Sequence, residues 1–212
     1  MRNALALLPL LSGCVVAADT AFSIDEPIEG VVVELSNGDV QVHGHGGTAT
    51  WVELDLGGLT ARHVSHEVID GVLWLSLDCG FTCGGDVLVE PPAGVWVDVR
   101  VDNGDVEISG IDGEVVASLG AGDLEAWELA SPNTCLSTAV GSITAESTVA
   151  PESLVAQVGT GNVEMRVPDG AYALDLEAGA GSVETTGVAH DRRSPFSISA
   201  RVSAGSIQVT GQ

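Results

Sequence analysis

Lysine is absent from this 212-residue chain, and only seven arginines stand against 30 aspartates and glutamates, so the formal net charge is −23. A surface this negative repels phosphate backbones and anionic lipid headgroups. We therefore expect no nucleic-acid partner and no attraction to an anionic membrane surface. The charge suits polyvalent cations, basic partners or a high-salt habitat, although solubility alone would also explain it.

Long apolar runs are missing too. No uninterrupted apolar stretch approaches the roughly 20 residues that a membrane-spanning helix needs. Any membrane attachment of the chain is therefore expected to come from a lipid.

Cysteines are few, and their spacing is not that of a metal site. Cys79 and Cys83 could close a small loop as a disulfide in an oxidising compartment. Cys135 would then be free and buried, or else the true partner of one of that pair. The spacing gives neither a C-x-x-C motif nor a second pair of cysteines, which argues against a redox or zinc role.

Aromatic residues make up only 4% of the chain, so each tryptophan matters. Exposed tryptophans bind other molecules well. Trp74 stands between Leu73 and Leu75 and is expected in the core, whereas Trp127 follows Glu125-Ala126 at an expected corner of the coil and is expected to be exposed.

The N-terminus carries a targeting signal. Arg2 supplies a positive charge, residues 4–11 are apolar, and Leu-Ser-Gly-Cys ends the segment at Cys14. This resembles a bacterial lipoprotein signal (1–13) with its lipobox, and the alternative is an ordinary secretory signal. The resemblance implies that Cys14 is lipidated, that the protein is anchored in the outer membrane or at the cell surface, and that residues 14–27 form a tether. Loss of Arg2 would leave six arginines against 30 acids, a charge of 6 − 30 = −24.

One pattern recurs seven times and predicts the architecture. In each copy a glycine is followed by Asp, Asn or Ser and then by Val, Leu or Ile, and apolar residues alternate on both sides, which is typical of strand, turn and strand. The seven glycines are Gly38, Gly104, Gly122, Gly141, Gly161, Gly181 and Gly205.

The spacing of these glycines favours a stacked array. From Gly104 onward it is 18, 19, 20, 20 and 24 residues, in the range of solenoid repeats. No single copy can bury its own apolar face, but stacked copies share one core. We therefore predict an all-β, single-domain β-solenoid with parallel strands, about 20 residues per coil and about nine or ten coils. The competing fold, a β-sandwich of hairpins, gives no reason for so constant a register.

The repeat also suggests how the domain (28–212) is organised. Residues 28–98 read as less regular coils or hairpins with projecting loops, and residues 99–212 read as the regular repeats. We see no linker between the two parts.

Residues 87–110 (VLVEPPAGVWVDVRVDNGDVEISG) and 113–124 (GEVVASLGAGDL) resemble the bacterial putative-adhesin domain family. The shared pattern is a strand, a proline-glycine corner, a second strand, an Asn-Gly-Asp turn and repeated glycine turns, and it extends over most of residues 30–212. The resemblance implies a β-solenoid. It implies no catalytic residues, and the family's function is largely uncharacterised.

Polar residues after the turn glycines form the most ordered polar feature, a turn ladder of Asp39, Asp105, Asp123 and Asn162. If the coils stack in register, these side chains line one edge, where carboxylates could bind calcium. The alternative is structural, since Asp, Asn and Ser bond nearby backbone amides in turns. The spacing differs from that of calcium-binding β-roll repeats.

Histidines are concentrated early in the domain. On a strand, His43 and His45 would point to the same face, an arrangement that zinc or copper sites use. Glycines flank His45 and no third ligand is fixed by spacing, so solvated loop histidines are the alternative.

These features predict a non-catalytic, adhesin-like or structural protein of the cell envelope that acts through its lateral surface and needs no cofactor. The partner would be a protein or a polysaccharide. Alternatives are a polysaccharide lyase or hydrolase that uses the acidic face, resting on fold analogy alone, and a calcium-dependent module. The chain stops directly after its last strand, so we also expect the final coil to be uncapped and to associate end to end.

Overall fold

The computed structural model describes residues 20–57, 63–78 and 84–212. These ranges contain strands, turns and loops but no helix, which confirms the all-β class. Cys14, Cys79 and Cys83, and with them the predicted lipidation site and disulfide, lie outside the described residues. Within these ranges, no helix is long and apolar enough to cross a membrane.

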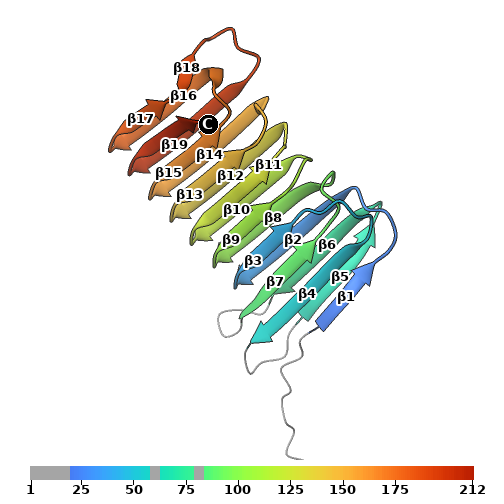
Figure 1. Cartoon of the computed structure of the whole chain (residues 1–212). Coiled ribbons are helices and arrows are strands. Elements are labelled where there is room, and N and C mark those ends of the chain that lie inside the picture. The colour runs from blue at the N-terminus through green and yellow to red at the C-terminus, as the bar shows by residue number, and fades with distance from the viewer. Residues whose placement is uncertain (1–19, 58–62, 79–83) are drawn as a thin grey trace, which may run out of the picture.

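Twenty strands form two ten-stranded sheets (Figure 1). We call them sheet A and sheet B. Sheet A has the order β1-β4-β7-β3-β9-β11-β13-β15-β20-β17, with the bounds Thr20–Ile24, Thr50–Gly57, Gly84–Glu90, Val40–His43, Val106–Ser109, Leu124–Leu129, Ile143–Ser147, Val163–Val167, Ile207–Gly211 and Val183–Thr186. Sheet B has the order β18-β16-β19-β14-β12-β10-β8-β2-β6-β5, with the bounds Val188–His190, Gly170–Ala180, Ser197–Ala204, Ser153–Thr160, Asn133–Val140, Val115–Ala121, Trp96–Asn103, Gly30–Asn37, Val72–Asp78 and His63–Ile69.

From β8 onward the chain crosses from sheet B to sheet A and back, and successive strands of one sheet run parallel. In sheet B, Val97 lies opposite Val115, and Val115 lies opposite Thr134. The offsets within these two pairs equal the first two spacings between turn glycines, from Gly104 to Gly122 and from Gly122 to Gly141. The repeat length therefore sets which residues pair.

Alternation places one side of every strand in the space between the sheets. The inward residues form a single apolar core, in which Val99, Leu136, Ile143, Leu154 and Met165 are wholly buried. Burial of each such side chain stabilises the fold by about 1.5–3 kcal/mol. The core therefore runs through the stacked strands, and it leaves the outward side chains free for other tasks.

The N-terminal third departs from parallel pairing. β4 runs antiparallel to both β1 and β7, and β5 runs antiparallel to β6. Residues 14–27, predicted as a tether, include β1, so that prediction is wrong for Thr20–Ile24. Phe22 and Ile24 pack against the core, and these two apolar residues are too short an alternation to indicate a strand from the sequence.

The order of the layers at the C-terminal end also differs from expectation. β19 lies between β14 and β16, and β20 lies between β15 and β17. The chain thus forms the outermost layer with β16 and β17 and then turns back to insert its last two strands (Figure 1). The prediction that the final strand ends the stack is wrong, because backbone pairing covers both of its edges.

Candidate functional site

The turn glycines stack directly on one another, which explains their regular recurrence. All seven have positive φ angles, between 127° and 152°. A Cβ at Gly122 would lie 1.8 Å from the carbonyl oxygen of Gly104. Only glycine therefore allows both this backbone conformation and this close stacking.

The turn ladder connects neighbouring layers by side chain to backbone hydrogen bonds. The Asp105 amide donates to Asp39 Oδ1 at 2.8 Å, the Asp123 amide to Asp105 Oδ1 at 2.8 Å, and the Ser142 amide to Asp123 Oδ1 at 2.7 Å. Asn162 continues the series by accepting from Ser206. Each side chain thus bonds the equivalent residue of the adjacent layer, whereas the structural interpretation of the sequence placed the bond within the same turn.

The stack of seven glycine turns has an eighth member that the sequence pattern did not identify. Gly85 stacks beneath Gly38, and Asp86 Oδ1 accepts a hydrogen bond from the Asp39 amide at 3.0 Å. The signal was present, because Gly85-Asp86-Val87 repeats the tripeptide Gly104-Asp105-Val106. Gly84 and Gly85 directly follow Cys83, so they could also be assigned to the expected disulfide loop.

The calcium and histidine hypotheses gain no geometric support. Among the described residues, no three His, Cys, Asp or Glu side chains surround a point that could hold a metal ion. His43 Nδ1 lies 2.7 Å from Ser109 Oγ. Both ring nitrogens of His45 contact backbone: Nδ1 accepts from the Gly47 amide, and Nε2 lies 3.0 Å from the Ala49 carbonyl oxygen. His45 therefore organises its loop.

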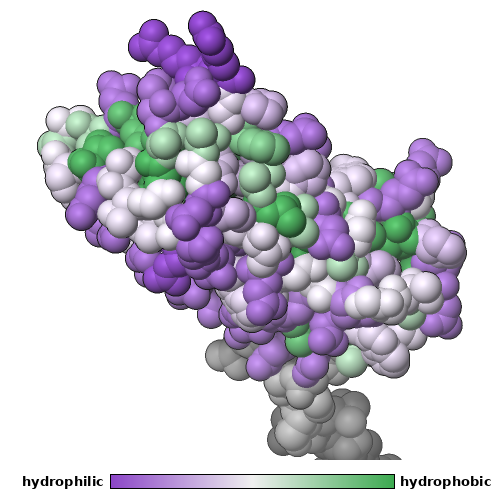
Figure 2. All heavy atoms as spheres, turned by 45° about the horizontal axis from the view of Figure 1, so that its top comes forward, coloured by the Kyte–Doolittle hydropathy of each residue, from purple (hydrophilic) through white to green (hydrophobic). Residues whose placement is uncertain are grey.

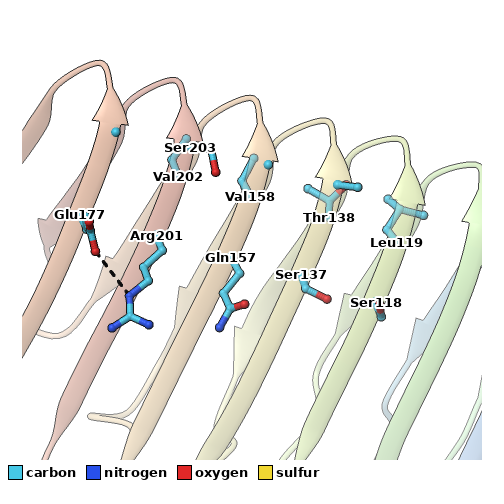
Figure 3. Close-up of a pocket in the computed structure, with 13 residues that line it drawn as sticks. Ser118, Leu119, Ser137, Thr138, Gln157, Val158, Glu177, Arg201, Val202 and Ser203 are labelled. Carbon is cyan, nitrogen blue, oxygen red and sulfur yellow. Dashed lines mark ion pairs between the residues drawn. The ribbon is translucent and has the colours of Figure 1, made fainter.

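A hollow lies on the outer face of sheet B. It is a trough of about 700 Å³ across β10, β12, β14, β19 and β16. Short side chains form it, and they include Ser118, Ser137, Gly159 and Ser203 (Figure 3). The longer side chains of Gln157, Glu177 and Arg201 line the trough beside these small residues.

One outward row of side chains crosses sheet B through this trough. In register it contains Glu34, Arg100, Ser118, Ser137, Gln157, Arg201 and Glu177. Ion pairs occupy both ends of the row: Arg100 lies 3.0 Å from Glu34, and Arg201 lies 2.9 Å from Asp175 and 3.8 Å from Glu177. The middle of the row is uncharged and offers only hydroxyl and amide groups.

Two tryptophans lie beside the end of the row that contains Glu34 and Arg100. Trp96 lies against Gly30, where a Cβ would meet the indole at 2.0 Å, and Trp74 is 43% exposed on β6. Val32, in register between Trp74 and Asp98, is buried although it faces outward. We call Val32, Trp74 and Trp96 the tryptophan platform.

The predictions for individual tryptophans were wrong. Leu73 and Leu75 face the core, so Trp74 between them must face outward, whereas Trp127 is half-buried. Trp51 is 56% exposed, but it lies on β4 in sheet A. Cys135, expected to be buried if free, is a free thiol exposed on β12.

Asp98 joins the platform to the row. Its Oδ2 accepts a hydrogen bond from Arg100 at 2.6 Å. Its Oδ1 is buried and has no hydrogen-bond partner in the described part of the chain. A buried acceptor without a donor is costly.

Comparison with known proteins gives likeness of fold. No family model matches the chain, and no curated protein does. A putative cell adhesion protein from Clostridium sporogenes has a similar structure at 10% sequence identity, with a TM-score of 0.54 over 92% of this chain and 100% of that one. A putative adhesin from Bacteroides fragilis matches at 13% identity and a TM-score of 0.42, over 93% of this chain and 98% of its own.

A putative adhesin from Parabacteroides distasonis matches at 14% identity and a TM-score of 0.39, over 92% of this chain and 98% of that one. With so few identical residues, the likeness to the Clostridium protein shows a shared fold and nothing about ligand or location.

Proposed function

We propose that this chain is a non-catalytic, adhesin-like protein of the cell envelope that binds an uncharged polysaccharide along the outer face of sheet B. The observation that carries the proposal is that the tryptophan platform and the trough lie on the same outer face of sheet B, with Asp98 and Arg100 of β8 between them. This face combines flat aromatic groups with a long, shallow hollow lined by hydroxyl and amide groups, and a polyhydroxylated chain needs both kinds of contact.

Charge narrows the class of ligand. The acidic chain repels polyanions, and the two arginines of the row are already paired with carboxylates. A neutral glycan meets no such repulsion, and its hydroxyl groups could donate to the serines of the trough.

The same proposal includes the architecture and the location. We interpret the two sheets as the faces of a β-solenoid whose coil length is the spacing between turn glycines, supported by parallel pairing at that same offset. The resemblance of residues 1–14 to a lipoprotein signal supports anchoring by a lipid at Cys14, in the outer membrane or at the cell surface.

Polysaccharide retention tests the function. The full chain, with its exposed thiol kept reduced, is passed over a panel of immobilised neutral and acidic envelope and extracellular polysaccharides, and both retention and soluble products are measured. We expect retention on a neutral polymer without cleavage. Loss of the Trp74 and Trp96 indoles (W74A, W96A) should weaken retention about tenfold or more, as expected for aromatic anchors.

Trp51→Ala is the matched control, because it removes an indole that is at least as exposed but lies on the other sheet. It should retain the polymer like the unchanged chain, and circular dichroism should show all variants folded. Equal losses in all three variants, or no retention on any neutral polymer, would refute the assignment to sheet B. Product formation would replace it with the alternative of a polysaccharide lyase or hydrolase.

A further inference from the structure

The two ends of the stack are built differently. At one end β1 and β5 close the sheets, and Phe22 on β1 stacks on His66 on β5 with ring centroids 4.2 Å apart. These rings come from the outermost strands of the two sheets, so their contact lies across the end of the core. At the other end, β17 is the last strand of sheet A, and all four of its residues are exposed.

The outermost layer at that second end has the sequence of an internal one. Its inward residues include Leu174, Leu176 and Val183, which are in register with the buried Ile198, Ala200 and Ile207 of the next layer. Leu174 and Leu176 are only partly buried, and Val183 is 43% exposed. Apolar side chains suited to a core are therefore left at a surface. Figure 2 turns this end toward the viewer, and apolar residues lie there in patches among hydrophilic ones.

The chain's own cap covers only part of this end. β18 pairs with β16 at Gly170–Tyr172, and His190 Nδ1 accepts from the Leu174 amide at 3.1 Å. Beyond that point, no described strand pairs with the outer edge of β16 or of β17. Free backbone donors and acceptors on such an edge are a template for another strand.

We propose that a second copy of this chain covers this open end, joined by a two-fold axis normal to the sheets. Such an axis would place β17 antiparallel to its copy and the part of β16 beyond β18 antiparallel to its copy at once, because β16 and β17 belong to the same layer. Both sheets would then continue through the contact, and Leu174, Leu176 and Val183 would be buried. Self-complementary contacts of this kind are the commonest in oligomers.

Area and charge favour this occupant. The free edges of β16 and β17 are about eight and four residues long, or about 26 Å and 13 Å, and two stacked sheets are about 20 Å deep with their side chains, so each copy would bury about 400 Å², the size of a weak contact between copies. Charge repels copies along the acidic sides of the stack. At this end Asp175 and Glu177 are paired with Arg201, and β17 carries a single charged residue, Glu184.

Sedimentation of the full chain tests the proposal, with a reducing agent present so that the exposed Cys135 cannot form a disulfide between copies. We expect a reversible monomer–dimer equilibrium that is half-complete at a micromolar or higher concentration, and X-ray scattering should show a dimer about twice as long as the monomer. The area predicts this weak affinity.

Two lysine substitutions locate the contact. Thr185 is exposed on β17 with its backbone amide on the free edge, so T185K places a charge in the proposed contact without disturbing the monomer. Gln208→Lys makes the same change on the outward face of β20 and is the control. We expect T185K to weaken dimerisation at least tenfold and Q208K to leave it unchanged.

Two results would overturn the proposal. One is a chain that stays monomeric up to about 1 mM, a weak limit of affinity, which would leave this edge to a strand of another protein. The other is a dimer that T185K does not weaken. Neither result bears on polysaccharide retention by sheet B, so this proposal and the proposed function can fail independently.

Discussion

Replacement of a single turn glycine by alanine should destabilise the stack severely. Gly122 has a φ of 136°, and a Cβ there would lie 1.8 Å from the Gly104 carbonyl oxygen and 2.9 Å from Asp105 Oδ1. Neither neighbour can withdraw freely. The Gly104 oxygen belongs to the backbone of the adjacent turn, and Asp105 Oδ1 holds the amide of Asp123.

The magnitude follows from two separate costs. A non-glycine residue in such a backbone conformation costs about 1–3 kcal/mol. To admit the methyl group the two turns must separate, which stretches the hydrogen bonds of the Gly104 amide to the Ala121 carbonyl oxygen and of the Asp123 amide to Asp105. Each lost bond costs about 1 kcal/mol, so Gly122→Ala should lower the free energy of unfolding by about 3–5 kcal/mol, a large part of a typical total.

Urea unfolding followed by circular dichroism measures this change, and Gly94→Ala is the control. A Cβ at Gly94 has no neighbour within 4 Å, so this variant should be neutral or up to about 1 kcal/mol more stable, because alanine restricts the unfolded chain. If G122A lost less than about 1 kcal/mol, the stacked turns would not be the reason for the repeated glycines.

Two further predictions concern the ladder and the buried phenol. Asp105→Ala removes the acceptor of the Asp123 amide and should cost about 1 kcal/mol, and calcium or a chelator should leave the melting midpoint of the unchanged chain where it is; a clear calcium-dependent rise would revive the metal hypothesis. Burial, assisted by the charge of Asp169, raises the pKa of Tyr172 above its ordinary value, so the folded chain holds the phenol proton more tightly and stability should fall as the pH rises above about 10. Tyr172→Phe should lose the hydrogen bond to the Pro168 carbonyl, and its stability should no longer fall at alkaline pH. If stability falls equally steeply with pH in both proteins, another group causes the fall.

Local alternation and repeat spacing predicted the strands from β8 to β15 and their parallel pairing. The distance from Gly104 to Gly122 equals the offset between Val97 and Val115 in the sheet, because each turn must stack on the next. The same alternation predicts that Trp74 faces the side opposite to Leu73 and Leu75. Its apolar neighbours favoured a place in the core, but side chains alternate along a strand, and this alternation determines which side of the sheet a residue faces.

The order of layers could not be read from the sequence in the same way. Ile198, Ala200 and Val202 of β19 repeat the inward pattern of Leu174, Leu176 and Ala178 of β16. Both strands suit an internal position equally well, and nothing local decides which of them lies between its neighbours. The trough was hidden for a related reason, since it depends on five strands whose small outward residues lie side by side only after stacking.

The two proposals have a joint geometric consequence. A two-fold axis normal to the sheets keeps each sheet B on the same side of the dimer, so both tryptophan platforms and both troughs would face one way. A polysaccharide offers many equivalent segments, and two sites on one rigid body can engage them together, which raises the apparent affinity without any new contact. Weak association at the open end would therefore be sufficient for two copies to bind one polymer together. Bound polymer holds the two copies close to each other and favours the same contact that aligns their binding faces.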